Sequence, residues 1–197
     1  MTMKKEQRTF EVSELRIARD SEKPRIVGHA AVFDTLGDGG WFREKVAKGA
    51  FADSIQTDDV RALFNHDPNF VLGRNRAGTL KLQEDERGLL IEVEPPDTQY
   101  ARDLVVSIER GDINQMSFGF ETIKDSWERS TEGNNLDIRT LEKVRLWDVS
   151  PVTFPFYKET DVAVRSHETW EKTLNEPEPT WNKVTNMRRR LKLHEWR

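Results

Sequence analysis

The sequence contains no cysteine and no long apolar run. Without cysteine, the chain can form no disulfide, use no thiol nucleophile and bind no metal through thiolates. No apolar stretch approaches the ~20 residues that a membrane helix needs. The first ten residues, MTMKKEQRTF, lack the apolar centre of a secretion signal. We therefore expect a protein that is made and used in the cytoplasm, with no membrane partner.

The chain also has few histidines and no excess of basic side chains. The chain has four histidines, none of them in an HExxH pattern, and GDGG at residues 37–40 lacks the lysine of a phosphate-binding loop. We expect no metal and no cofactor. The 31 basic side chains are outnumbered by 35 acidic ones, giving a net charge of −4. That balance does not favour a general nucleic-acid-binding protein, which would be basic, so we expect no specific nucleic acid partner.

Charged residues make up 34% of the chain, above the usual quarter, and hydrophobic residues 36%. Apolar clusters nevertheless recur from Phe10 to Phe156, so one core can form. The charged excess is expected on the surface and in the tails. A length of 197 residues suits one domain with an extension, or two small domains.

Strand patterns dominate the first two thirds of the chain. Alternating or continuous apolar residues predict strands over 25–33, 60–66, 79–85, 88–94, 113–123 and 137–154. Short helices are predicted over 46–55 and 97–110; the second would be capped by Asp97, end at Gly111 and place Tyr100, Leu104 and Ile108 on one face. The polar stretches 34–41 and 124–135 are predicted loops.

The composition changes after Phe156. Residues 158–197 are highly charged, contain the sequence EPEPT at 176–180 and end in the basic cluster RRRLK. We therefore predict a core domain over 1–157 and a charged C-terminal extension over 158–197. The extension is predicted to be either a solvated helix or a segment that targets the protein to a scaffold.

A hydroxyl nucleophile needs a neighbouring base and a group that orients the base. Ser117 lies in MSFGF, where alternation places it with Gly119 and away from Met116, Phe118 and Phe120. The pattern by itself favours an ordinary strand serine. A G-x-S-x-G elbow is absent, so the α/β-hydrolase arrangement is not indicated.

Two of the histidines are candidates for the base. His66 ends a predicted strand in NHDP, next to Pro68, and His29 lies inside a predicted buried strand. The pattern by itself favours a structural role for each of them. His167 and His194 lie in the polar extension and are expected on the surface.

Two aspartates are candidates for the orienting acid. Asp148 interrupts an apolar strand, where an unpaired carboxylate would be costly. The alternative is Asp67, which should point away from its neighbour His66, because adjacent strand residues face opposite sides.

Six short motifs occur in a specific order between about residues 10 and 157: GHAAVFD, FREKVAKGAF, FNHDP, LGR, MSFGF and WDVSPVTFP. Together they resemble the prohead proteases of tailed bacteriophages. The resemblance implies an α+β fold, mainly an antiparallel β-barrel with surrounding helices, similar to herpesvirus assemblin. It also implies His66 as base, Ser117 as nucleophile and Asp148 as acid.

The resemblance further implies a serine endopeptidase that acts inside the assembling prohead in the host cytoplasm. Its substrates would be the scaffolding region of the major capsid protein or a separate scaffold protein, together with the protease itself, and it could form a homo-oligomer. Asp148 stands where the family often has Glu, and Pro151 departs from the more usual VSLVTFP. The alternative is a non-catalytic module that binds the capsid or scaffold protein.

Overall fold

The computed structural model describes residues 5–10, 15–20, 23–38, 40–130, 136–154 and 161–175. Nearly half of them form strands: β1 (Glu6–Phe10), β2 (Arg16–Ala18), β3 (Arg25–Val32), β4 (Gly37–Asp38), β5 (Arg43–Val46), β6 (Arg61–Phe64), β7 (Asp67–Arg74), β8 (Leu80–Glu84), β9 (Gly88–Val93), β10 (Gln115–Glu128) and β11 (Ile138–Val152). The helices are α1 (Ser54–Thr57), α2 (Gln99–Glu109) and α3 (Asp161–Asn175), with a 3-10 turn η1 (Asn75–Ala77).

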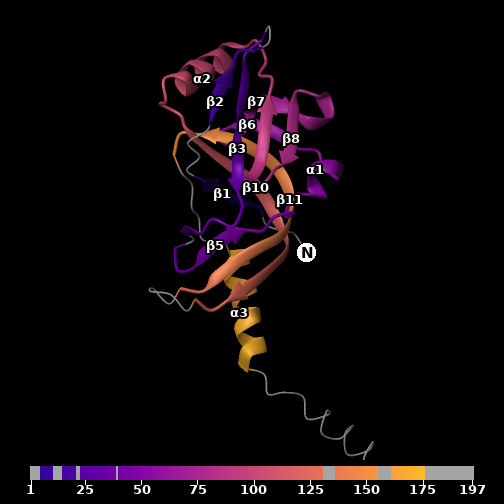
Figure 1. The fold of residues 1–197 in the computed structure, drawn as a ribbon, viewed down its shortest axis with the longest axis vertical. Helices are drawn as coiled ribbons and strands as arrows, with labels where there is room; N and C mark the ends of the chain where they lie inside the picture. Colours follow the sequence, from indigo (N-terminus) through magenta and orange to yellow (C-terminus); the bar gives the residue numbers. More distant parts are fainter. Residues whose placement is uncertain are drawn as a thin grey trace, which may run out of the picture.

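The larger sheet is built around the long antiparallel ribbon of β10 and β11, which runs from the body of the protein toward α3 (Figure 1). The strand order is β1-β10-β11-β5-β4. Two strands pair in parallel with opposite ends of β11: β5 with its beginning and β6 with Asp148 and Val149. The β6 pairing brings the turn after β6 close to the end of β11.

The second sheet has the order β2-β3-β9-β8 and is antiparallel throughout. Side chains from both sheets form one core, with Ile26 and Ile91 on one side and Phe118 and Leu146 on the other. These strands confirm an α+β fold with mainly antiparallel pairing. The described strands pair into two sheets and do not close into a barrel, so the expected assemblin-like barrel is not confirmed.

Several predicted elements are present. The strand over 25–33 is β3, and the hairpin over 79–94 is β8 and β9. Helix α2 buries Leu104 and Ile108 and ends before Gly111, whose φ of +79° suits a glycine stop. The predicted cap is wrong by one residue, because Thr98 and not Asp97 precedes the helix.

Two other predictions were wrong. Residues 46–55 do not form one helix: turns occupy most of the stretch, and α1 begins only at Ser54. Gly49, with φ +85°, interrupts the helical path. The predicted loop over 124–135 is also wrong at its start, since β10 continues through Glu128. Trp127 extends the strand because its ring packs against Trp41 and Phe42.

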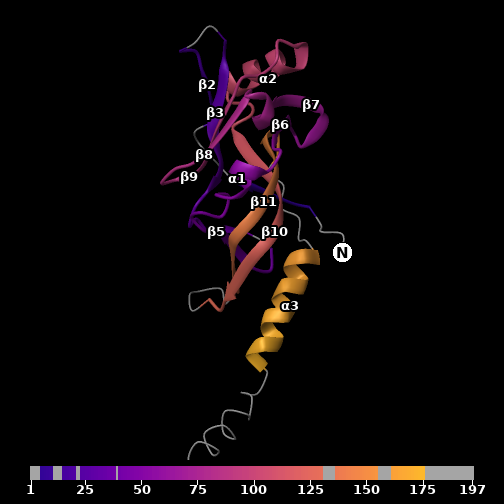
Figure 2. The ribbon, with the colours of Figure 1, turned by 90° about the vertical axis from the view of Figure 1, so that its right-hand side faces the viewer.

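Helix α3 lies beside the far end of the β10–β11 ribbon (Figure 2). Ala163 and Trp170 pack against Trp127 there. The domain boundary near residue 158 stays a prediction. The EPEPT sequence, the RRRLK cluster and His194 lie outside the described residues. Among the described helices, none has the length and apolar character needed to cross a membrane.

Charged side chains also lie in the interior, contrary to the expectation that they would stay on the surface. Arg139 is 0% exposed and lies between Glu6 at 2.9 Å, Glu44 at 3.1 Å and Asp125 at 2.7 Å. Arg8 binds Glu6 and Glu44 from the other side. Buried charges are tolerated when each is paired, and this network ties β1, β5, β10 and β11 together.

Candidate active site

Ser117 lies near the start of β10, between two neighbouring strands. It stands opposite Thr9 of β1 and Ser150 of β11. Phe118 points into the core, where it packs against Phe51. The alternation of MSFGF therefore holds the Ser117 hydroxyl rigidly on the side away from the aromatic core.

His66 lies in the turn between β6 and β7, not at a strand end as predicted. The strand stops at Phe64, and both Asn65 (φ +54°) and His66 (φ +57°) are left-handed. Pro68 does not end the pairing either, since it lies inside β7. A left-handed conformation is uncommon for residues other than glycine, although Asn and His are enriched there.

The main chain and side chain of Asn65 hold this turn against the end of β11. Its N–H donates to the Pro151 carbonyl at 3.0 Å, its amide donates to the Thr153 hydroxyl at 3.1 Å, and it accepts from the Thr153 N–H at 2.9 Å. These bonds fix where His66 points. The asparagine of the NHDP motif therefore positions the histidine that follows it.

The structure brings all three predicted side chains together. His66 Nε2 is 2.6 Å from Ser117 Oγ, and His66 Nδ1 bonds to Asp148 Oδ1. The serine, imidazole and carboxylate form a continuous chain of hydrogen bonds, which is the arrangement of a Ser-His-Asp triad. Their separation in sequence, 51 residues from serine to histidine and 82 from histidine to aspartate, is bridged only by the fold.

Asp148 is 1% exposed and has two further polar partners. Ser150 Oγ donates to Oδ1 at 3.0 Å and lies 3.4 Å from His66 Nδ1, while Lys5 Nζ is 2.5 Å from Oδ2. Burial by itself would raise the pKa of Asp148, but the bonds and charges of His66 and Lys5 outweigh it and hold the pKa below its usual range. Asp148 is therefore ionised beside the imidazole.

Sequence reasoning did not connect three neighbouring residues with Asp148. Ser150 could have been found, because it lies two residues along the same strand and thus on the same face. Gly119 faces Asp148 so closely that an added Cβ would lie 2.4 Å from Oδ2, so only glycine leaves room for the acid. Lys5 gave no signal in the sequence, because its contact joins residues 143 apart.

The two alternative residues lie elsewhere. His29, on β3, bonds through Nε2 to Asp85 at 2.9 Å, which fits the structural role expected for it. Asp67 accepts bonds from the main chain and amide of Asn69 and so closes its own turn.

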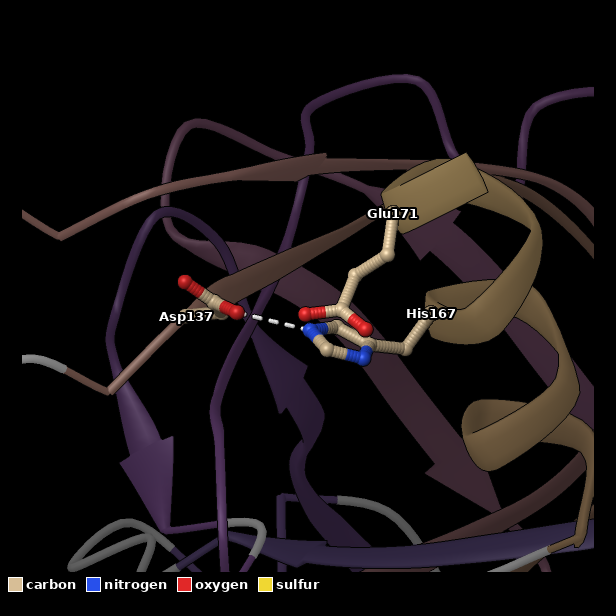
Figure 3. Close-up of side chains that lie close together, drawn as sticks. All are labelled: Asp137, His167 and Glu171. Carbon is tan, nitrogen blue, oxygen red and sulfur yellow. Dashed lines mark hydrogen bonds and ion pairs between the residues drawn. The ribbon is translucent and has the colours of Figure 1, made fainter. Parts of the chain in front are cut away.

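Another histidine, His167 on α3, has two carboxylates close to its ring (Figure 3). His167 bonds to Asp137 at 2.6 Å, and Glu171 approaches the same imidazole from one helical turn further on. The three could offer one ligand atom each to a metal. The ring also packs against both Trp41 and Trp127, so the expectation of a solvated surface histidine was wrong.

The hydrogen bond between His167 and Asp137 joins α3 to the residue that precedes β11. Glu171 in turn lies 3.9 Å from Arg129. These two contacts explain the cluster as one that holds α3 in place.

Comparison with known proteins assigns the chain to a family. The model of the Caudovirus prohead serine protease family matches residues 9–175, which include all three triad residues. The chain belongs to this family. The prohead protease of Enterobacteria phage HK97 is 26% identical over 159 residues, covering 79% of this chain and 66% of that protein.

The chain also resembles a solved structure. That structure is the bacteriophage T4 capsid assembly protease, with a TM-score of 0.46 and 11% identity, covering 78% of this chain and 97% of that one.

Proposed function

We propose that this protein is a serine endopeptidase with Ser117 as nucleophile, His66 as general base and Asp148 as the acid that orients it. The observation that carries the proposal is the unbroken chain from Ser117 Oγ through His66 to Asp148. Membership of the prohead serine protease family supports it.

In this mechanism, His66 Nε2 takes the hydroxyl proton as Ser117 Oγ attacks a peptide carbonyl carbon. The proton then passes to the departing amine, and the C–N bond breaks to leave an acyl-enzyme. Water, deprotonated by the same imidazole, hydrolyses the ester. Asp148 accepts the Nδ1–H bond throughout and stabilises the imidazolium, and main-chain N–H groups would bind the oxyanion.

We further propose that the substrates are the scaffolding region of the major capsid protein, or a separate scaffold protein, and the protease itself. Cleavage would take place inside the assembling prohead in the host cytoplasm, with the extension over 158–197 recruiting the enzyme to the shell. The name of the HK97 relative supports a role in prohead maturation. The competing function is a non-catalytic capsid-binding module.

The test is cleavage of the purified capsid precursor, followed by mass spectrometry of the products. Ser117→Ala should lower the rate by about 10⁴-fold or more, as in other triad enzymes, with an unchanged circular dichroism spectrum. Ser107→Ala is the matched control, because that hydroxyl is partly exposed on α2 and donates to the Asp103 carbonyl in its own helix. Normal cleavage by Ser117→Ala would exclude this mechanism.

The same assay separates the two candidate acids. Asp148→Asn should be strongly impaired, since an amide cannot stabilise the imidazolium. Asp67→Asn should cleave at nearly the normal rate, because Asp67 serves its own turn. Equal rates for the two variants would remove Asp148 from the proposed triad.

A further inference from the structure

The Ser117 side chain has no exposed surface. The residue is 0% exposed, and β1 lies along the edge of the sheet directly beside it, with Thr9 opposite Ser117. A substrate must bring its carbonyl carbon to roughly 3–3.5 Å from the attacking oxygen. Some part of the cover over Ser117 therefore has to move before any peptide can react.

The main chain of β1 also competes for the serine proton. Ser117 Oγ donates to the Arg8 carbonyl oxygen at 2.8 Å, while His66 Nε2 lies at 2.6 Å. A hydroxyl carries one proton, so a bond to Arg8 takes that proton away from the base. At the other end of the triad, Lys5 binds Asp148. Segment 5–10 thus contacts both ends of the catalytic chain.

Strand β1 has the features of a bound peptide. It is extended, pairs antiparallel with the strand that carries the nucleophile, and presents a carbonyl oxygen to Ser117 Oγ. Peptides commonly bind proteins by adding such a strand to the edge of a sheet.

We propose that β1 is an internal inhibitor that occupies the place of the substrate, and that an extended peptide pairs with β10 after β1 has left. This proposal rests on the proposed function, since it concerns the same serine.

The Arg8 side chain indicates which peptides would fit. It binds the buried carboxylate of Glu44 on β5 and lies over the Phe120 ring at 5.7 Å. When β1 leaves, Glu44 loses its ion pair with Arg8 and retains its ion pair with Arg139. A substrate with Arg or Lys at the position of Arg8, whose carbonyl faces the nucleophile, restores the lost ion pair. Glu44 is thus a specificity-determining residue that selects a basic side chain before the cleaved bond.

The inhibitory role is tested on the full chain with a fluorophosphonate probe, by following Ser117 labelling with intact-protein mass spectrometry. In the wild type, the labelling rate should level off as the probe concentration rises, because opening of β1 becomes limiting. Arg8→Ala removes a charged anchor and should raise the plateau about tenfold or more.

A second variant covers the case in which Arg8→Ala does not fold. Lys5→Ala removes a half-exposed ion pair and should raise the plateau about threefold. Lys45→Ala is the matched control, since it breaks a comparable pair with Glu128 away from β1. Equal rates in all folded variants, rising in proportion to the probe, would overturn the inhibitory role.

The subsite is tested with two peptides that differ only in Arg or Glu before the cleaved bond. The Arg peptide should have a kcat/KM at least about tenfold higher, and Glu44→Gln should reduce this preference. Equal kcat/KM values would overturn the assignment of Glu44. If the wild type cleaves the capsid precursor while the β1 variants behave as wild type, only the inhibitory role fails. If no folded variant cleaves the precursor or labels at Ser117, the proposed function itself fails.

Discussion

At the residue scale, the site depends on a glycine as much as on its three reactive side chains. Gly119 stands opposite Asp148 on the neighbouring strand. An added Cβ would lie 2.4 Å from Asp148 Oδ2 and 2.7 Å from Lys5 Cε. Any side chain at this position must displace the carboxylate from the imidazole it orients.

We predict that Gly119→Ala lowers kcat by about 100-fold, the effect of misplacing a catalytic group by about 1 Å. Gly37→Ala is the control, because its new Cβ would meet nothing closer than a main-chain oxygen at 3.6 Å. Peptide hydrolysis by the two purified variants, with circular dichroism to verify folding, decides the matter. Equal kcat values would show that Asp148 tolerates the displacement.

At the element scale, the strands around the site are joined by buried charges. Arg139 on β11 binds carboxylates from β1, β5 and β10. Removing one member of such a network leaves the others charged, buried and unpaired, which is strongly destabilising. The network therefore holds β1 and β5 in register with the strands that carry the triad.

Arg139→Leu should accordingly lower the free energy of unfolding by about 3–5 kcal/mol. Lys143→Leu, on the same strand but with a side chain 47% exposed and an exposed partner in Asp53, should change it by no more than about 0.5 kcal/mol. Guanidinium denaturation of both variants measures the difference. Similar stabilities would mean that the buried network contributes little.

At the scale of the whole molecule, the buried carboxylates make stability depend on pH. Burial would raise the pKa of Glu6, but the charges of Arg139 and Arg8 outweigh it and lower the pKa. The pKa of Asp148 is lowered as well. A carboxyl group with a lower pKa in the folded state stabilises the fold fully above its unfolded pKa. That contribution is lost as the pH falls through the folded value.

The guanidinium midpoint should therefore stay nearly constant from pH 7 to pH 5 and fall below about pH 4, where unfolded Glu and Asp begin to bind protons. Glu6→Gln should show a smaller loss over the acid range, because one of these carboxyl groups has been removed. A pH dependence identical to that of the wild type would show that Glu6 makes no such contribution.

Local pattern determined much of the secondary structure. Strand β3, the β8–β9 hairpin and the buried face of α2 follow from alternation or helical periodicity, which depend only on residues near one another in sequence. Local pattern gave wrong predictions where contacts between distant residues determine the secondary structure. Trp127 extended β10 into a predicted loop because Trp41 and Phe42 pack on it.

The sequence by itself determined the class of fold and, through six ordered motifs, the three side chains that meet at the site. Only the tertiary structure decided the left-handed turn that aims His66, the space that Gly119 leaves for Asp148 and the burial of Arg139. It also decided that β1 lies over Ser117, a contact between residues 109 apart. Such contacts depend on strand register and burial, which arise from packing the whole chain and leave no periodic signal in any one segment.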